Sequence, residues 1–305
     1  MPGRILGIDI GATTVKFAAL KAGGTLADRG VLPVASTNNA AFVAQLAAII
    51  SRPEFADCDR VGIGSPGPLD LDTETIIASA NMPGVKDLKL VAELKKRYPR
   101  LEFRLENDAN AATLGEKYFG AGKAFADFAV LTLGTGVGGG CIFGGRLQRG
   151  FRGNFFEVGH VNVAGIFAEG ARRCGCGSLG CLEAYASATG IAKSYEANSG
   201  IKLSAAEIAR LARAGDEHAI RAYLIAGKAL GFAMAAITQL MNLTHFVLTG
   251  GVAAAHDLLQ AELDSAYRAQ TLAVFHAEFR AVFTAGDENA GILGAAALFL
   301  EAAEK

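Results

Sequence analysis

The sequence of 305 residues has no excess of charge of either sign, since 29 Lys and Arg residues are balanced by 30 Asp and Glu residues and the formal net charge is -1. It also has no long run of like charge. Nucleic-acid-binding proteins usually carry a basic patch, so this balance argues against a nucleic-acid partner. Residues 1–4 lead into an apolar segment without the charged-then-apolar order of a signal peptide, and we expect neither a leader nor a transmembrane span.

Cysteine is scarce, with five residues in the chain. Without a secretory leader, we expect these thiols to remain reduced in the cytoplasm. The length is enough for about two domains. A hydrophobic fraction of 51% predicts well-filled cores and an ordinary soluble globular protein.

Metal-ligand residues gather in one glycine-rich stretch. Three of the five cysteines lie between Cys174 and Cys181, and the nearest histidine is His160. One histidine with three cysteines is a closed tetrahedral set of the kind that structural zinc takes. Ordinary buried thiols are the alternative, because small buried cysteines are common. The glycines within residues 175–180 and the arginines at 172–173 indicate a loop rather than a core element, which favours zinc.

Two acids flank this loop. Glu157 precedes His160, and Glu183 follows Cys181. A zinc ion that held the loop rigid would orient both carboxylates toward a ligand.

A hairpin with an acid at its turn is predicted near the N-terminus. Residues 4–10 are apolar, and residues 15–20 resume a β pattern after Gly-Ala-Thr-Thr at 11–14. The N–H groups and hydroxyls of such a turn can bind a phosphate, while Asp9 can face a magnesium ion carried by a nucleotide. Lys16 is a candidate phosphate partner. An ordinary turn and a solvated lysine are the alternatives.

Strands and helices then alternate, which predicts an α/β fold. Asn81 follows a predicted strand and either caps a local turn or points its amide into a cleft. Helices are expected at residues 40–50, 87–97, 109–120, 205–213, 217–241 and 289–303, and strands at residues 60–64, 75–80, 101–105, 128–133, 141–143, 245–248 and 281–284.

The strand at residues 101–105 ends in Glu106-Asn107-Asp108. Ligands of open α/β sheets gather at the carboxyl ends of strands, so Asn107 and Asp108 are candidate site residues. A helix N-cap is the alternative, because Asp and Asn are preferred caps and a helix follows. Both roles stay open here, and neighbouring residues can fill both.

Two more glycine turns follow predicted strands later in the chain. Residues 134–140, Gly-Thr-Gly-Val-Gly-Gly-Gly, predict a tight loop whose N–H groups can approach a polyphosphate. The lysine and spacing of a Walker A loop are absent, and a strand follows instead of a helix, so neither a P-loop nor a dinucleotide turn is supported. Residues 249–251, Thr-Gly-Gly, could receive the nucleoside end of the same ligand. Two glycine-threonine hairpins, each opening an α/β half, predict a duplicated fold that binds one nucleotide.

The order of these motifs resembles the ROK family of sugar kinases and repressors. The motifs are Asp-Ile-Gly-x-Thr (9–13), Glu-Asn-Asp (106–108), Leu-Gly-Thr-Gly-Val-Gly-Gly-Gly (133–140), Glu-x-Gly-His (157–160), Cys-x-Cys-Gly-x-x-Gly-Cys-x-Glu (174–183) and Leu-Thr-Gly-Gly (248–251). The cysteine motif with Glu-x-Gly-His is highly specific to that family, whereas the glycine loops alone are not. The resemblance covers nearly the whole chain and implies an actin/hexokinase-like (ribonuclease H-like) α/β fold, duplicated in two lobes, with sugar and ATP in the interlobe cleft.

The resemblance also implies residue roles, with Asp108 as the general base. Zinc would be held by His160, Cys174, Cys176 and Cys181. Sugar hydroxyls would be bound by Gly67, Asn81, Asn107, Asp108, Glu157, His160 and Glu183. The nucleotide and its magnesium would be bound by Asp9, Gly11, Thr13, Lys16, Thr135, Gly136, Gly250 and Gly251.

The expected lobes are residues 1–118 and 119–288, with a C-terminal helix at about 289–305 that packs back on the first lobe. The expected partners are a small-molecule sugar and ATP with magnesium. Homodimers are usual for the family, and we expect a homodimer without nucleic-acid or membrane partners.

The first glycine turn leaves the phosphoryl donor open. Ala12 replaces the usual glycine, and Thr14 stands where many family members have lysine, with Lys16 two positions later. A polyphosphate-using branch has a lysine at a similar offset, so polyphosphate is the alternative to ATP. Residues 153–156 are bulkier than is common in glucokinases, which leaves the sugar open.

A non-catalytic sugar-sensing regulator is the alternative to a kinase. Regulators of the family carry an N-terminal helix-turn-helix, for which a first strand beginning by Ile5 leaves no room, and Asp108 is retained. We therefore expect a hexose or N-acetylhexosamine kinase. A hydrolytic ATPase is disfavoured because Glu157 and Glu183 suit a polyol.

Overall fold

The computed structural model describes residues 4–11, 13–21, 24–79, 82–168, 170–284 and 289–301. The chain divides into two compact units. Unit 1 comprises residues 1–126, 140–156 and 288–305, and unit 2 comprises residues 127–139 and 157–287. Unit 1 is therefore assembled from three separate stretches of the sequence.

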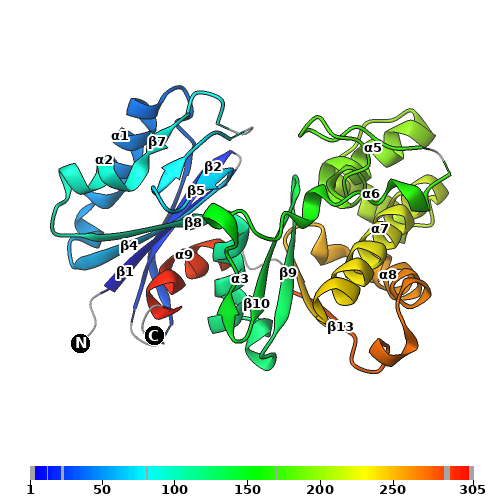
Figure 1. The fold of residues 1–305 in the computed structure, drawn as a ribbon. Coiled ribbons are helices and arrows are strands. Elements are labelled where there is room, and N and C mark those ends of the chain that lie inside the picture. Colours follow the sequence, from blue (N-terminus) through cyan, green and yellow to red (C-terminus); the bar gives the residue numbers. More distant parts are fainter. Residues whose placement is uncertain are drawn as a thin grey trace. The chain divides into compact units, whose positions relative to one another are not determined.

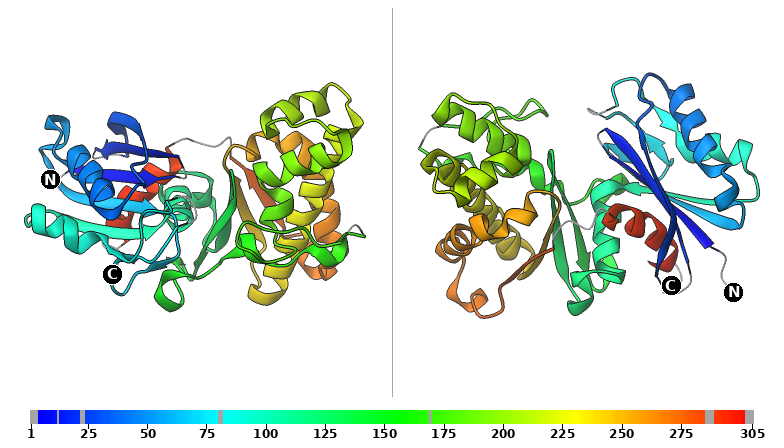
Figure 2. Two further views of the ribbon diagram at one scale, coloured as in Figure 1. Left: turned by 90° about the horizontal axis from the view of Figure 1, so that it is seen from above. Right: turned by 180° about the vertical axis from the view of Figure 1, so that it is seen from behind.

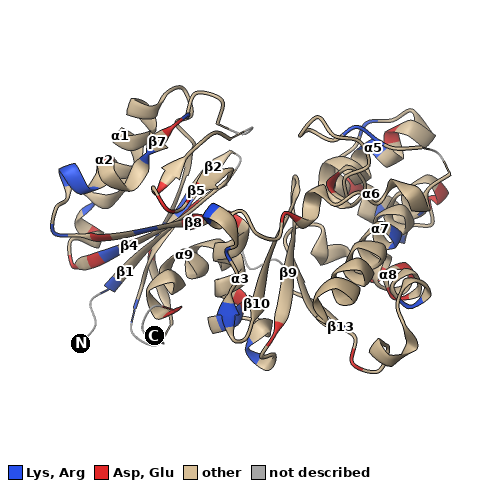
Figure 3. Cartoon of the chain, in the orientation of Figure 1, with Lys and Arg blue, Asp and Glu red and all other residues tan. Residues whose placement is uncertain are grey.

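Strands and helices alternate along both units (Figure 1). The strands are β1 (Arg4–Ile10), β2 (Thr14–Leu20), β3 (Leu26–Pro33), β4 (Cys58–Ser65), β5 (Leu69–Asp70), β6 (Thr75–Ile76), β7 (Leu88–Lys89), β8 (Glu102–Asn107), β9 (Phe128–Leu133), β10 (Val137–Phe143), β11 (Arg146–Leu147), β12 (His245–Thr249) and β13 (Arg280–Phe283). The α-helices are α1 (Asn39–Ile50), α2 (Leu90–Arg97), α3 (Asp108–Tyr118), α4 (Glu183–Ala186), α5 (Ala188–Ser199), α6 (Ala205–Arg213), α7 (Glu217–Met241), α8 (His256–Gln270) and α9 (Ala290–Glu301). Basic and acidic residues are interspersed along the elements of each unit (Figure 3), as the balanced composition suggests.

The sheet of unit 1 has the strand order β3-β2-β1-β4-β8. β1, β4 and β8 are parallel, whereas β2 pairs antiparallel with β1 and β3. The predicted N-terminal hairpin is confirmed, with Asp9 opposite Lys16 across β1 and β2. Because the central strands are parallel, their carboxyl ends share one edge of the sheet.

Helices cover both faces of this sheet. Leu6, Ile8 and Ile10 alternate along β1 and join a buried cluster with residues of α1 and α2. The intervening residues face α9, which packs against β1, β4 and α3 (Figure 2). At Gly62 a Cβ atom would lie only 1.8 Å from the carbonyl oxygen of Ala295, so glycine is required for α9 to approach the sheet.

The second sheet has the order β11-β10-β9-β12-β13, and the division into units passes through β10. In unit 2, β12 is parallel to both β9 and β13. The long helix α7 packs along α8, where a Cβ atom at Gly231 would lie 2.3 Å from the carbonyl oxygen of Leu263. α7 is long and apolar enough to cross a membrane, but 56% of its most apolar window is buried inside the structure, and core helices of soluble proteins have the same composition.

Capping residues explain where several helices begin. The side chain of Asn38 accepts a hydrogen bond from the backbone N–H of Ala41 at the start of α1, and Asp216 does the same for Ala219 in α7. Ser204 and Glu207 form a complete capping box at the start of α6. Such caps satisfy N–H groups that have no partner inside the helix.

Two predictions about unit 1 were wrong in detail. The strand predicted at residues 75–80 is only Thr75–Ile76, and it forms a small antiparallel sheet of order β5-β6-β7. The helix predicted from residue 87 begins at Leu90, because Asp87 has φ 47°, outside the right-handed helical region.

Candidate functional site

Three candidate residues lie along the carboxyl edge of the sheet in unit 1. Asp9 pairs with Gly64 across β1 and β4, and Ser65 pairs with Asn107 across β4 and β8. A Cβ atom at Gly64 would lie 3.7 Å from Cα of Asp108 and 3.9 Å from Oδ1 of Asp9. The structure therefore brings Asp9, Asn107 and Asp108 to one edge of the sheet.

Asn107 caps the helix that follows β8. Its side-chain oxygen accepts hydrogen bonds from the backbone N–H groups of Ala109 at 2.9 Å and Asn110 at 3.2 Å. Asp108 is the first residue of α3, and its Oδ1 also accepts from Ala109 at 2.9 Å. The capping role thus belongs chiefly to Asn107, while the carboxylate of Asp108 lies at a helix N-terminus, where the macrodipole favours negative charge.

Asp9 is a partly buried acid with a shifted pKa. Burial raises the pKa of Asp9 to about 6, against the opposing effect of the positive charge on Lys16. Its carboxylate lies against the first turn of α9, where a Cβ atom at Gly291 would come within 2.4 Å of Asp9 Oδ2. Glycine at this position gives the carboxylate its space.

The other predicted residues of unit 1 shape the turns beside this edge. The N–H of Gly11 donates to the carbonyl oxygen of Thr14 at 2.8 Å, and the carbonyl oxygen of Thr13 accepts from Val34 at 3.0 Å. A Cβ atom at Gly67 would lie 3.5 Å from Nδ2 of Asn107, so that turn contacts the same site. Asn81 lies outside the described residues.

The two glycine turns of unit 2 lie next to each other. The turn containing Thr135 and Gly136 follows β9, and the turn containing Gly250 and Gly251 follows β12, its parallel neighbour. Gly250 has φ 104°, and a Cβ atom there would lie 2.5 Å from the carbonyl oxygen of Leu133. Two adjacent turns with close backbone approach can present N–H groups to a polyphosphate.

Glu183 connects the first of these turns to the cysteine loop. It is the first residue of α4, and its Oε2 accepts a hydrogen bond from the N–H of Val137 at 3.1 Å. A Cβ atom at Gly136 would lie 2.4 Å from the same oxygen. The position of this carboxylate therefore depends on glycine at residue 136.

Glu157 and His160 lie in one tight turn. The backbone N–H of His160 donates to the carbonyl oxygen of Glu157 at 3.0 Å. Between them, a Cβ atom at Gly159 would lie 1.9 Å from the carbonyl oxygen of Val137, so the turn packs on the start of β10 only with glycine there.

Four residues of unit 2 form a potential metal centre. These residues are His160, Cys174, Cys176 and Cys181, and their ligand atoms all lie within 4.8 Å of one another. Nδ1 of His160 lies 3.9 Å from Sγ of Cys174, and the sulfurs of Cys176 and Cys181 are 3.7 Å apart. Four mutually close nitrogen and sulfur ligands fit a tetrahedral zinc ion.

The thiols of this cluster differ in acidity. Hydrogen bonds from the backbone and side chain of Ser178 lower the pKa of exposed Cys176 to about 7. Burial raises the pKa of Cys174 to about 12. A bound cation deprotonates coordinating thiols, so the cluster is suited to a metal that supplies positive charge.

The candidate residues thus form two groups, one in each unit. Unit 1 contains Asp9, Gly11, Thr13, Lys16, Gly67, Asn107 and Asp108. Unit 2 contains Thr135, Gly136, Glu157, His160, Glu183, Gly250, Gly251 and the three cysteines.

Sequence analysis did not identify Gly291, Arg149 and Glu301, whose contacts reach the first group directly or through Glu106. Gly291 adjoins Asp9, and Arg149 forms ion pairs with both Glu106 and Glu301. These contacts join residues far apart in the chain, which no local pattern reveals. The only sequence signal was the position of Glu106 next to Asn107.

The chain is similar to known proteins over nearly its whole length. The sequence matches the ROK family over residues 5–302. It is 33% identical to a glucokinase of Thermotoga maritima over 314 residues, covering 98% of each chain. The structure superposes on the ROK hexokinase from Thermus thermophilus with a TM-score of 0.80 and 31% identity, covering 99% of this chain and 100% of that chain.

A second solved structure contains ligands. The ROK family glucokinase from Streptomyces griseus, in complex with glucose and AMPPNP, matches with a TM-score of 0.79 and 28% identity over 97% of this chain and 99% of that chain. The predicted α/β fold is confirmed by these similarities. The chain therefore belongs to the ROK family and has its actin/hexokinase-like fold.

Proposed function

We propose that this protein is an ATP-dependent carbohydrate kinase that transfers the γ-phosphoryl group of ATP to a hydroxyl of a hexose or N-acetylhexosamine. The similarity to the two kinases of known structure and to the Thermotoga maritima glucokinase supports the reaction class. The observation that carries the proposal is the placement of Asp9 and Asp108 on one edge of the sheet in unit 1.

The two carboxylates would have different roles. A sugar hydroxyl is a poor nucleophile, so Asp108 would accept its proton as the phosphoryl group arrives. Asp9 would face the magnesium ion of the nucleotide, which neutralises the developing negative charge. The turn with Gly11 and Thr13, the side chain of Lys16 on β2, and the turns with Thr135, Gly136, Gly250 and Gly251 would bind the nucleotide.

The sugar ligands are proposed from the family resemblance. They are Gly67, Asn81, Asn107, Asp108, Glu157, His160 and Glu183. Zinc bound by His160 and the three cysteines would be structural, since four protein ligands leave no open position for a reaction. Its contribution would be to fix the imidazole of His160 and the loop that carries Glu183.

A coupled ADP-release assay tests the proposal. The purified protein is offered glucose, fructose, mannose, allose, N-acetylglucosamine and N-acetylmannosamine in turn, each with ATP and magnesium. We expect sugar-dependent ADP release with at least one of them. ADP release without sugar would indicate a hydrolytic ATPase, and sugar binding without turnover would indicate a sugar-sensing regulator.

The donor, the assembly and the location need their own measurements. Polyphosphate replaces ATP in a parallel assay that detects the sugar phosphate, and we expect ATP to be the better donor. We further propose a cytoplasmic homodimer, which light scattering coupled to size-exclusion chromatography and cell fractionation would test.

A further inference from the structure

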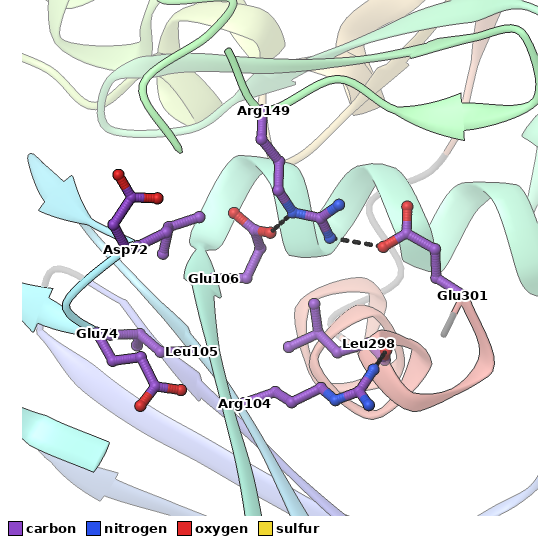
Figure 4. Close-up of a pocket in the computed structure, with 9 residues that line it drawn as sticks. Asp72, Glu74, Arg104, Leu105, Glu106, Arg149, Leu298 and Glu301 are labelled. Carbon is purple, nitrogen blue, oxygen red and sulfur yellow. Dashed lines mark hydrogen bonds and ion pairs between the residues drawn. The ribbon is translucent and has the colours of Figure 1, made fainter. Parts of the chain in front are cut away.

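Arg149 joins two acids that come from distant parts of unit 1. It follows β11, and its Nε donates to Oε2 of Glu106 at 2.6 Å while its Nη2 donates to Oε2 of Glu301 at 2.5 Å. Figure 4 shows its guanidinium between the two carboxylates, at one side of a cavity of about 370 Å³. Glu106 is the residue before the last of β8, and Glu301 is the last residue of α9.

Glu106 connects Arg149 to the turn at residues 106–110, which contains Asp108. Its side chain is only 1% exposed, so its lone pairs need partners within the protein. The carboxylate oxygen that does not contact Arg149 accepts hydrogen bonds from the backbone N–H of Asn107 and from Nδ2 of Asn110, each at 3.0 Å. Arg149 is therefore connected through one carboxylate to the residues on either side of Asp108.

Glu301 anchors the other end of this network. Its Oε1 accepts a hydrogen bond from the backbone N–H of Leu147 at 3.2 Å, while its Oε2 contacts Arg149. The strand β11, the end of α9 and the end of β8 thus meet at one guanidinium. Its planar fork of donors fixes the direction of both contacts, which the flexible ammonium of lysine would not do.

We propose that Arg149 is a positioning residue for phosphoryl transfer: it holds the Glu106–Asn110 turn against α9 and so fixes the carboxylate of Asp108. The proposal rests on the proposed kinase function. Arg149 itself contacts neither substrate nor Asp108 in this scheme. A catalytic base must lie within hydrogen-bond reach of its proton, and a shift of about 1 Å can lower the rate by about 100-fold.

The test compares Arg149→Met and Arg149→Lys with the wild-type enzyme. We expect Arg149→Met to lower kcat by about 10- to 100-fold, with the KM for sugar changed by no more than about threefold. Arg149→Lys keeps the charge without the fork, so it should restore part of the lost kcat. A folded Arg149→Met enzyme with kcat within twofold of wild type would overturn the proposal.

Arg104 offers a matched control in the same cavity. Its Nη1 donates to the carbonyl oxygen of Leu298 on α9 at 2.6 Å, and its Nη2 pairs with Glu102, away from the catalytic turn. Arg104→Met should lower the melting temperature and leave kcat within about twofold of wild type. An equal loss of kcat in Arg104→Met would mean that Arg149 acts only through general stability, and the proposal would be wrong.

Glu301→Gln keeps the inference testable if Arg149→Met does not fold. This variant weakens only the anchor and leaves the contact between Arg149 and Glu106 in place. We expect kcat to fall by about 3- to 10-fold and the backbone amides of Ala109 and Asn110 to exchange faster with solvent. Unchanged kcat or unchanged exchange would contradict the proposal.

Amide exchange also tests the role of Arg149 independently of kinase activity. If the wild-type protein released no ADP with any sugar, the proposed function would fail. Exchange at Ala109 and Asn110, compared between wild type and Glu301→Gln in the ligand-free protein, would still decide whether the network holds the turn.

Discussion

Sγ of Cys174 donates a hydrogen bond to Oε1 of Glu183 at a distance of 3.3 Å. The potential metal centre and a proposed sugar ligand are thus in direct contact. The second oxygen of Glu183 accepts from the N–H of Val137, next to a proposed phosphate-binding turn. We therefore expect a change in the metal cluster to affect sugar binding more than the stability of the whole fold.

Cys176→Ser tests the link between the metal and the sugar. Cys176 is exposed, so its replacement leaves the core intact, but it removes one ligand of four. We expect the zinc content to fall to near zero and the KM for sugar to rise roughly tenfold, because the loop that carries Glu183 loses its anchor. Metal analysis and steady-state kinetics measure the two effects. Cys58→Ala, which removes a thiol in unit 1, should keep its zinc, and a zinc-free enzyme with normal KM would contradict the prediction.

Asp108→Asn tests the general base. Asparagine can still accept the hydrogen bond from Ala109, but it cannot take the proton of a sugar hydroxyl. We expect kcat to fall by about 100-fold or more while the sugar dissociation constant changes little. Asp72→Asn, at an exposed carboxylate of the same unit, should be close to wild type. Unchanged turnover in Asp108→Asn would remove this residue from the mechanism.

Much of the fold could be predicted from local patterns in the sequence. The apolar run at residues 4–10 matches β1, and the helices expected at 205–213 and 217–241 match α6 and α7. The strand β3 was not predicted, because it is an edge strand with exposed, charged residues such as Asp28 and Arg29, so it has no clear alternation. Such an edge strand depends on pairing with a neighbouring strand that the sequence does not reveal.

The candidate residues were accessible to sequence analysis only where they lie in compact motifs. Cys174 and Cys181 are close in sequence, so their proximity could be inferred from spacing. Gly291 and Asp9 are at opposite ends of the chain, and their contact arises only when α9 packs on β1. The same holds for Glu301 and Arg149, which are 152 residues apart.

The pKa of Asp9 predicts how unit 1 responds to pH. An acid whose pKa is raised by folding, here to about 6 from 3.8, contributes stability that is present below pH 4 and is lost as the pH rises through 6. The loss is on the order of 2 to 3 kcal/mol at most, at about 1.4 kcal/mol per pKa unit. Urea unfolding without added magnesium should therefore show that Asp9→Asn gains stability relative to wild type between pH 4 and pH 7. A difference that did not vary with pH would contradict the burial of a charged Asp9.

Gly291→Ala tests the packing of α9 against the same acid. Alanine normally favours a helix over glycine by up to about 1 kcal/mol, so helix propensity alone predicts no harm. A Cβ atom at this position would nevertheless lie within 2.4 Å of the Asp9 carboxylate, which must move away from the site. We expect kcat/KM for the magnesium-nucleotide complex to fall by about tenfold with a small change in melting temperature. Gly165→Ala is the control, since a Cβ atom there meets nothing within 4 Å. If both variants had wild-type kinetics, the carboxylate of Asp9 would not need its observed position, and its role in binding magnesium would have to be abandoned.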